Sequence, residues 1–161
     1  MTNRNPILTF ESCGRVFGCD LLWIGEILRC PPVMPVDCPS ESVRGHIRLR
    51  GQKLTVLDLE VRIGLTAANL PPTERCIVFR TADELARLVS VPDNVGEAVS
   101  DRLGILVDKI GETIPSGTEI RCPAPGTLVG IDPACISGVV ALRDSYAMVL
   151  KIGMLLACGK P

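Results

Sequence analysis

Cysteine and histidine are the residue types in this 161-residue chain that most often bind metals or act as nucleophiles and bases. Eight cysteines stand at positions 13, 19, 30, 38, 76, 122, 135 and 158, and no two of them form a C-x-x-C pair. His46 is the single imidazole, and it lies beside Ile47 in a segment typical of a β-strand, which favours a surface or capping role. We therefore predict no catalytic residue, no metal site and no cofactor.

Phosphate and nucleic-acid binding have little support in the sequence. No glycine-rich phosphate loop of the form G-x-x-x-x-G-K-[ST] or G-x-G-x-x-G occurs, and the net charge of −1 provides no field that would draw the protein to nucleic acid. Residues 44–53, RGHIRLRGQK, are basic but contain no aromatic residue for base stacking, so a solvated hairpin face is the simpler interpretation. A module that binds nucleic acid or another protein through this run stays an open alternative.

The apolar stretches are too short or too interrupted for a membrane protein. The first ten residues, MTNRNPILTF, lack the apolar segment of a secretory signal, and no stretch reaches the roughly 18 residues of a membrane-spanning helix. These features predict a cytoplasmic protein without direct membrane insertion and with reduced thiols. A thiol-based redox or metal sensor that uses the cysteines stays a second alternative.

Two segments of the chain repeat each other at fixed offsets. The sequence from position 17, FGCDLLWIGEIL, matches LGILVDKIGETI from position 103, which places Gly18 on Gly104 at an offset of 86. The sequence from position 45, GHIRLRGQKLTVLDL, matches GVVALRDSYAMVLKI from position 138 at an offset of 93. Two matches in the same order indicate an internal duplication.

Short strands with turn signals dominate both copies. The alternation of Ile47, Leu49, Leu54 and Val56 fits a hairpin with one buried face, and Gly51 is a suitable turn residue. Only 3% of residues are aromatic, so the core is expected to consist of Leu, Ile and Val, which favour strands. We predict an all-β fold of two small antiparallel barrels, at about residues 16–75 and 76–156.

Helical segments are expected to be short. Asp58 and Gly64 are suitable start and stop residues for the segment between them, and GMLLAC is expected to form a closing turn. Residues 81–101 have no counterpart in the first copy and are predicted to be an insertion, with a helical turn at about 83–88. Because long loops are tolerated at low entropic cost, we expect the core to survive removal of residues 82–100.

Four motifs in a fixed order resemble the CheW-like chemotaxis adaptor family: G-x-x-x-L-R-G-x-x-x-x-V-x-D-L, G-I-L-V-D-x-I-x-E, I-R-x-P-A-P and I-S-G-V-V-A-L…M-V-L-K-I. The resemblance implies a single CheW-like domain, residues 1–161, with two five-stranded SH3-like barrels that share a hydrophobic core. It also implies an adaptor without catalytic activity that couples transmembrane chemoreceptors to a cytoplasmic histidine kinase. Such an adaptor is cytoplasmic and reaches membrane receptor arrays through its partners.

The receptor-binding residues that the resemblance implies are Ile24, Glu26, Ile27 and Arg50, beside the first barrel. The cytoplasmic tip of such a receptor is a helical hairpin, so Ile24 and Ile27 are expected to contact the apolar ridge of a helix. Glu26 and Arg50 are expected to orient that helix. An alternative role for Arg50 is to brace its own hairpin turn through bonds to backbone carbonyls.

The kinase-binding residues that the resemblance implies are Ile77, Gly104 and Ile110, on the second barrel. Packing of this barrel on the regulatory domain of the kinase, which has the same fold, is expected to bury a small apolar patch. The insertion at residues 81–101 adjoins this predicted surface, so it is expected to alter the contact or to add another.

Overall fold

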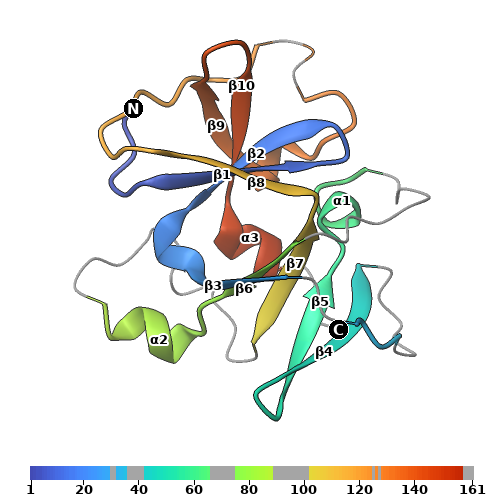
Figure 1. The fold of residues 1–161 in the computed structure, drawn as a ribbon. Coiled ribbons are helices and arrows are strands. Elements are labelled where there is room, and N and C mark those ends of the chain that lie inside the picture. Colours follow the sequence, from blue (N-terminus) through green and yellow to red (C-terminus); the bar gives the residue numbers. More distant parts are fainter. Residues whose placement is uncertain are drawn as a thin grey trace.

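Ten strands and a few short helices make up the described part of the chain, which in this computed structural model comprises residues 1–29, 32–35, 42–65, 75–88, 102–124, 126 and 128–157. One five-stranded sheet has the order β8 (Lys109–Ile114), β1 (Ile7–Ser12), β2 (Arg15–Asp20), β10 (Tyr146–Leu150) and β9 (Ile136–Ala141). The other has the order β3 (Ile24–Arg29), β6 (Arg75–Phe79), β7 (Leu103–Val107), β5 (Gln52–Leu57) and β4 (Val43–Leu49). Figure 1 shows the first sheet in the upper half of the molecule and the second in the lower half. The predicted all-β fold with two five-stranded units is confirmed.

The two sheets exchange strands between the two copies of the repeat. β1 and β2 of the first copy lie with β8, β9 and β10 of the second, and β6 and β7 of the second copy lie with β3, β4 and β5 of the first. Two parallel pairs, β2 with β10 and β5 with β7, make this exchange in otherwise antiparallel sheets. The predicted lobes at residues 16–75 and 76–156 therefore do not coincide with the sheets. The repeat pattern identifies equivalent strands but does not specify which copy each one pairs with.

The residues matched by the repeat occupy equivalent places in the two sheets. Gly18 of β2 lies opposite Val149 of β10, and Gly104 of β7 lies opposite Val56 of β5. An added Cβ atom would approach a neighbouring atom to 2.7 Å at Gly18 and to 2.9 Å at Gly104. The nearest atoms belong to Ile7 of β1 and Ile77 of β6, so each glycine lets the antiparallel neighbour of its strand approach closely. The strands that carry the two glycines therefore have equivalent places in the two strand orders, β2 in one sheet and β7 in the other.

The β4–β5 hairpin has the predicted buried face and turn. Ile47, Leu54 and Val56 are each 0% exposed. Arg50 and Gly51 form the two-residue loop, with φ angles of 48° and 80°. Positive φ at both central residues is characteristic of a type I′ turn, whose twist matches that of the flanking strands.

The predicted helical turns form at both places. The N-cap of α1 (Leu59–Arg62) is Asp58, whose carboxylate accepts hydrogen bonds from two backbone N–H groups of the helix. Gly64 follows α1 with a φ of 96°, as expected for a helix stop. The closing turn is α3 (Ile152–Ala157).

One hydrophobic cluster joins the two sheets. It contains Phe10 and Phe17 from one sheet, Phe79 and Ile105 from the other, and Leu155 of α3, each at most 1% exposed. Figure 1 shows α3 between the sheets, where its Leu155 packs into this cluster. Two smaller clusters lie within the separate sheets. The expectation of two units that share a core is confirmed.

The predicted insertion contributes a helix to this core. α2 (Ala82–Ala86) begins with a capping box, in which the side chains of Thr81 and Glu84 each accept a hydrogen bond from the other's backbone N–H. Leu85 is 0% exposed and belongs to the shared cluster. The burial of Leu85 contradicts the expectation that the core survives removal of residues 82–100, because this side chain fills space between the sheets.

Replacing Leu85 by alanine is expected to lower the free energy of unfolding by about 2–5 kcal/mol, because the change removes buried apolar surface and leaves a cavity. Leu88→Ala is the matched control, since Leu88 is only partly buried against the same cluster, and it should cost less. Urea unfolding followed by the fluorescence of Trp23, the single tryptophan, measures both variants. Equal effects of the two substitutions would show that α2 does not fill the core.

Candidate functional site

An ion pair joins the two ends of the β3-β6-β7-β5-β4 sheet. Arg50 lies at the tip of the β4–β5 hairpin, and Glu26 lies on β3, the edge strand at the other end of the strand order. Nη1 of Arg50 donates a hydrogen bond to Oε1 of Glu26 at 3.2 Å, and Nη2 donates to Oε2. This two-bond geometry fixes the relative orientation of the groups as well as their distance. The structure thus brings together two of the four predicted receptor-binding residues.

The guanidinium of Arg50 remains accessible although it is paired. Its side chain is 69% exposed, and that of Glu26 is 28% exposed. The hydrogen bond from Arg50 lowers the pKa of Glu26, and the same bond raises the pKa of Arg50, so both groups are charged at neutral pH. Bracing of the turn falls to Arg48 instead, whose Nη1 donates to the carbonyl of Gly51 at 3.4 Å.

A β-bulge on β3 separates the apolar residues from this ion pair. Ile24 lies opposite Phe79 of β6 and Glu26 lies opposite Val78, so β3 has one extra residue at this point. Because successive side chains alternate between faces, Ile24 and Ile27 point to the side of the shared core and Glu26 points to the other side. Ile24 is 6% exposed and Ile27 is 39% exposed, so Ile27 is the isoleucine that offers apolar surface to a partner.

The three predicted kinase-binding residues do not form one accessible patch. Ile77 is 0% exposed, and Gly104 is buried beside it in the β6–β7 pair. Ile110 lies in the other sheet, on β8 opposite Phe10, and is partly buried against the shared cluster. Of these three residues, Ile110 has side-chain surface available for a contact.

Two further charged residues lie beside Glu26 and are not identified as site residues by the sequence pattern. Nη2 of Arg102 is 2.7 Å from Oε1 of Glu84, a residue in the first turn of α2. The charge of Arg102 also lowers the pKa of Glu26 and that of Glu84 raises it, although both effects are smaller than that of the hydrogen bond from Arg50. The T-x-x-E pattern at Thr81 predicts the start of a helix, but not that this helix lies near β3.

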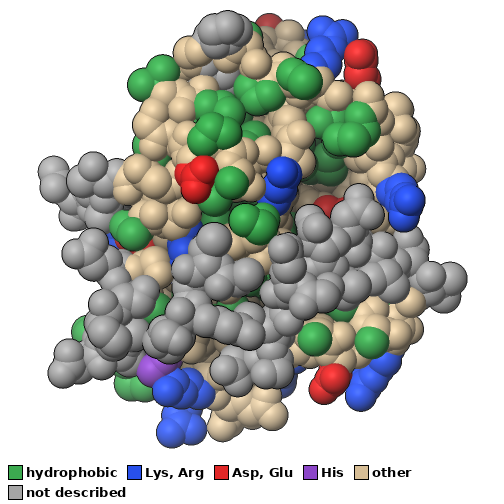
Figure 2. Space-filling model, turned by 180° about the vertical axis from the view of Figure 1, so that it is seen from behind, with side chains coloured by type: hydrophobic (Ala, Val, Ile, Leu, Met, Phe, Trp, Pro, Cys, Tyr) green, Lys and Arg blue, Asp and Glu red, His purple; other side chains and the backbone are tan. Residues whose placement is uncertain are grey.

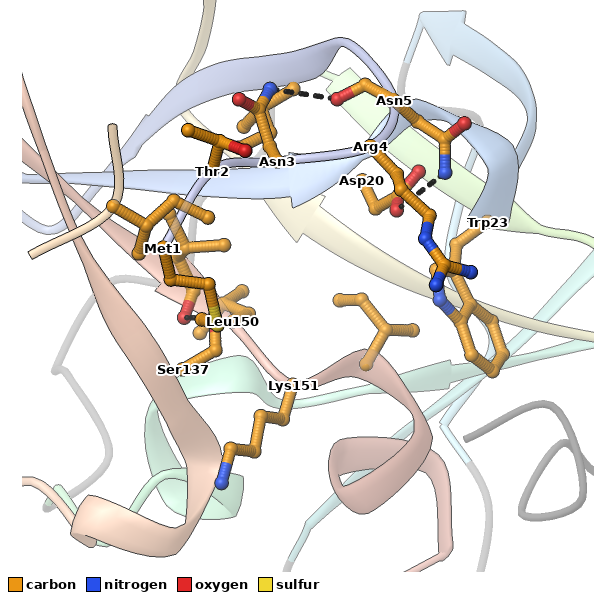
Figure 3. Close-up of a pocket in the computed structure, with 14 residues that line it drawn as sticks. Met1, Thr2, Asn3, Arg4, Asn5, Asp20, Trp23, Ser137, Leu150 and Lys151 are labelled. Atoms are coloured by element: carbon orange, nitrogen blue, oxygen red, sulfur yellow. Dashed lines mark hydrogen bonds between the residues drawn. The ribbon is translucent and has the colours of Figure 1, made fainter. Parts of the chain in front are cut away.

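A cavity of about 600 Å³ lies between the N-terminal residues and the ends of β2 and β10. Figure 3 shows Trp23 and Lys151 around it, with residues 1–5 along its other side. Its carboxylate, Asp20, accepts hydrogen bonds from the backbone N–H of Leu22 at 2.9 Å and from the side chain of Asn5 at 3.2 Å. Asp20 therefore caps η1 (Leu21–Trp23).

The described residues include no group of three His, Cys, Asp or Glu side chains placed to hold a metal ion. Cys19, Cys76 and Cys135 are buried, and burial raises the pKa of the Cys19 thiol well above its usual value, which disfavours the reactive thiolate. Three other cysteines, at positions 30, 38 and 158, lie outside the described residues. In the part of the chain that the structure describes, no helix has the length and apolar character needed to cross a membrane.

Nearly the whole chain is similar to one protein family. The model of the CheW-like domain matches residues 6–160. The chain belongs to the CheW-like domain family. The chemotaxis protein CheW of Treponema pallidum (strain Nichols) is 28% identical over 152 residues, which cover 92% of this chain and 80% of that protein. The chemotaxis protein CheW of Rhizobium meliloti (strain 1021) is 22% identical over 146 residues, which cover 91% of this chain and 83% of that protein.

A solved structure shares the CheW-like fold. The crystal structure of the scaffolding protein TtCheW from Thermoanaerobacter tengcongensis gives a TM-score of 0.69 at 23% identity, covering 96% of this chain and 92% of that chain. The family match spans both copies of the repeat and residues 81–101 as one CheW-like domain. The resemblance that the sequence motifs indicate is thereby confirmed.

Replacing Glu26 by glutamine is expected to lower the melting temperature at pH 7 by only about 1–3 °C, since an ion pair in contact with solvent contributes little. The pKa of Glu26 is lowered in the folded state, so its contribution is present above the unfolded pKa and is lost as the pH falls through the folded value. The difference from the wild type should therefore begin to shrink near pH 4.3, about the pKa of an unperturbed glutamate, and disappear once the pH is below the lowered pKa of the folded state.

Melting curves between pH 3 and pH 7 measure this difference. Glu119→Gln is the matched control, because Glu119 and Arg121 form a pair at 3.2 Å whose side chains are 63% and 66% exposed, and its loss should have no measurable effect. A deficit of Glu26→Gln that persists at low pH would show that lost packing, and not lost charge, is its cause.

Proposed function

We propose that this chain is a non-enzymatic adaptor of chemotaxis that couples transmembrane chemoreceptors to a cytoplasmic histidine kinase. The observation that carries the proposal is the Glu26–Arg50 ion pair, which lies at a sheet edge and matches the residues by which the family is expected to bind receptors. Membership of the CheW-like family supports it, as do relatives named chemotaxis proteins and a solved relative named a scaffolding protein. The proposed location is the cytoplasm, at receptor arrays that the chain reaches through its partners.

The receptor-binding part of the proposal uses the edge strand β3. A helix of the receptor tip that lies along this edge would contact the exposed side chain of Ile27 with its apolar ridge. A polar side chain of the same helix would reach Arg50, whose position Glu26 holds. Ile24 would support the strand from the core without contacting the partner.

The second copy supports the choice of β3 as the receptor side. Glu112 and Arg143 are the counterparts of Glu26 and Arg50 at the offsets of 86 and 93. Among the described residues these counterparts form no ion pair with each other. The loop between β9 and β10 has four residues, whereas the β4–β5 loop has two. Arg143 therefore has a different position in its hairpin loop from that of Arg50 in the β4–β5 loop. The two edges therefore offer the same charged residue types to a partner in different arrangements.

Co-sedimentation with membranes and the kinase tests the proposal. We expect the chain to sediment with membranes that contain a chemoreceptor, to stay in the supernatant with receptor-free membranes, and to bring the kinase to the receptor membranes. A chain that binds neither receptor membranes nor the kinase would contradict the proposal. Equal sedimentation with receptor-free membranes would indicate lipid binding instead.

Arg50→Glu is expected to weaken binding to a soluble fragment of the receptor tip about tenfold or more, because it removes the exposed guanidinium and places a second carboxylate beside Glu26. Arg50→Lys is the control, since it keeps the charge at the same φ of 48° but loses the two-bond geometry, and it should be intermediate. Isothermal titration calorimetry measures the affinities, and melting curves verify that both variants are folded. Unchanged affinity of Arg50→Glu would remove this residue from the receptor site.

The kinase-binding part of the proposal uses the edge of β8. This strand is the counterpart of β3, and Ile110 corresponds to Ile24 at the offset of 86. Because Ile77 and Gly104 are buried, Ile110 is the residue of the predicted set that we retain as a contact. Packing of this edge on a regulatory domain of the same fold would bury Ile110 more completely.

Ile110→Glu is expected to lower the affinity for the regulatory domain of the kinase about tenfold or more, because it puts a charge into an apolar contact. Its affinity for the receptor fragment should stay within about twofold of the wild type, since β8 lies in the other sheet. Ile110→Val is the control that keeps the site apolar. Calorimetric titration with each partner decides between a kinase contact, which reduces one affinity, and a general loss of folding, which reduces both.

A further inference from the structure

Three cationic side chains surround a small hollow next to the Glu26–Arg50 pair. The hollow has a volume of about 190 Å³ and is lined by Arg50, Lys53 and Arg102, with Leu49 and Leu54 as apolar walls. Since a water molecule takes up about 30 Å³ in the liquid, the hollow has room for one side-chain carboxylate together with a few waters.

The positive charge around the hollow exceeds what the described carboxylates balance. Two of the three cations have carboxylate partners, Glu26 and Glu84, whereas Lys53 forms no ion pair among the described residues. Lys53 also lies directly opposite Arg48 across the β4–β5 ladder. Like charges in that arrangement destabilise a strand pair, so the hairpin carries a cost that an anionic partner would relieve.

This positive potential does not depend on histidine. Figure 2 shows Lys and Arg side chains beside the histidine at the lower end of the molecule, where Figure 1 shows the β4–β5 hairpin. Burial, followed by the charge of Lys53, lowers the pKa of His46, which is therefore neutral at pH 7. Lys and Arg supply the charge, and it stays constant through the physiological pH range.

Both arginines keep donors for another acceptor. A guanidinium has five N–H groups. Arg50 uses two of its nitrogens on Glu26, and the ion pair of Arg102 with Glu84 involves Nη2 alone, at 2.7 Å. Among the described residues, a further carboxylate would therefore find donors in the hollow without displacing Glu26 or Glu84.

We propose that this basic hollow binds an aspartate or glutamate side chain of the helical partner that contacts Glu26 and Arg50, an inference that rests on the proposed receptor-binding function. The carboxylate of the partner accepts hydrogen bonds from Arg102 and Lys53 and relieves the repulsion along the hairpin. An acidic peptide fits better than nucleic acid, because the hollow takes a single anionic group and its lining contains no aromatic side chain for base stacking.

The proposal gives the insertion a role at the receptor side. Arg102 directly follows residues 81–101, and Glu84 of α2 holds its guanidinium, while Leu85 anchors α2 in the core. The counterparts of Lys53 and Arg102 in the repeat are Tyr146 and Val16, and the hollow that these two residues line has one cationic side chain, Arg15, instead of three. The hollow therefore distinguishes the receptor side from the kinase side.

Binding of a soluble helical hairpin from a chemoreceptor tip to Lys53→Gln and Arg102→Gln tests this inference. Each variant is expected to lower the affinity about three- to tenfold and to reduce its dependence on salt, because each removes one cation from the hollow. Arg121→Gln removes the same charge and also breaks a pair, with Glu119, but lies outside the hollow and should bind like the wild type. Changing each acidic residue of the hairpin to its amide should reveal one position that is coupled to Arg102→Gln in a double-mutant cycle.

The outcomes separate this inference from the function on which it rests. A wild type that binds the hairpin, with both variants equally tight, overturns the role of the hollow and leaves the proposed function standing, whereas a wild type that does not bind the hairpin overturns both. Tight binding of a single-stranded oligonucleotide that weakens steeply with salt and is lost in both variants would overturn the acidic-peptide proposal in favour of nucleic acid. If melting curves show that Arg102→Gln is unfolded, the affinity of Lys53→Gln alone tests the inference, because the side chain of Lys53 is exposed and its replacement should not disturb the fold.

Discussion

The parallel pairing of β2 with β10 and of β5 with β7 is the interaction on which the rest of the structure depends. Each pair joins a strand of one copy of the repeat to a strand of the other, so neither copy can complete a sheet alone. The pairing is remote in sequence, with Gly18 opposite Val149, and both paired strands contribute residues to the cluster between the sheets. Strands of both copies therefore build each sheet, and the shared cluster joins the two sheets.

The same exchange places the candidate site. β6 and β7 of the second copy lie between β3 and the β4–β5 hairpin of the first in the strand order. The positions of Glu26 and Arg50, which form the ion pair, are therefore set by strands of the other copy. An ion pair this exposed contributes little to stability, so the sheet determines the geometry of the pair and not the reverse. Arg102 stands directly before β7, and its distance from the pair is consequently set by the same strand order.

Features that depend on neighbouring residues follow from the sequence. The cap at Asp58 and the turn at Gly51 are required by local backbone chemistry, and both are found as predicted. The choice of pairing copy is not encoded in periodicity, because equivalent strands suit either sheet equally well. The alternating pattern also does not predict the bulge on β3. Its one extra residue moves the side chain of Glu26 to the face opposite that of Ile24.

The two sheets have equivalent edges, β3 and β8, and the proposed coupling role requires that these edges bind different partners. Shape alone distinguishes them poorly, because the strand orders of the two sheets are equivalent. The difference lies in one hairpin: β1 and β2 are joined by Cys13 and Gly14, whereas β6 and β7 are joined through a segment that contains α2 and ends next to Arg102. Burial of Leu85 fixes this segment to the core, so the additional cation has a defined position. In the proposed adaptor, partner choice would then rest on the different arrangement of charges around the two edges, because unpaired or like charges disfavour the wrong partner.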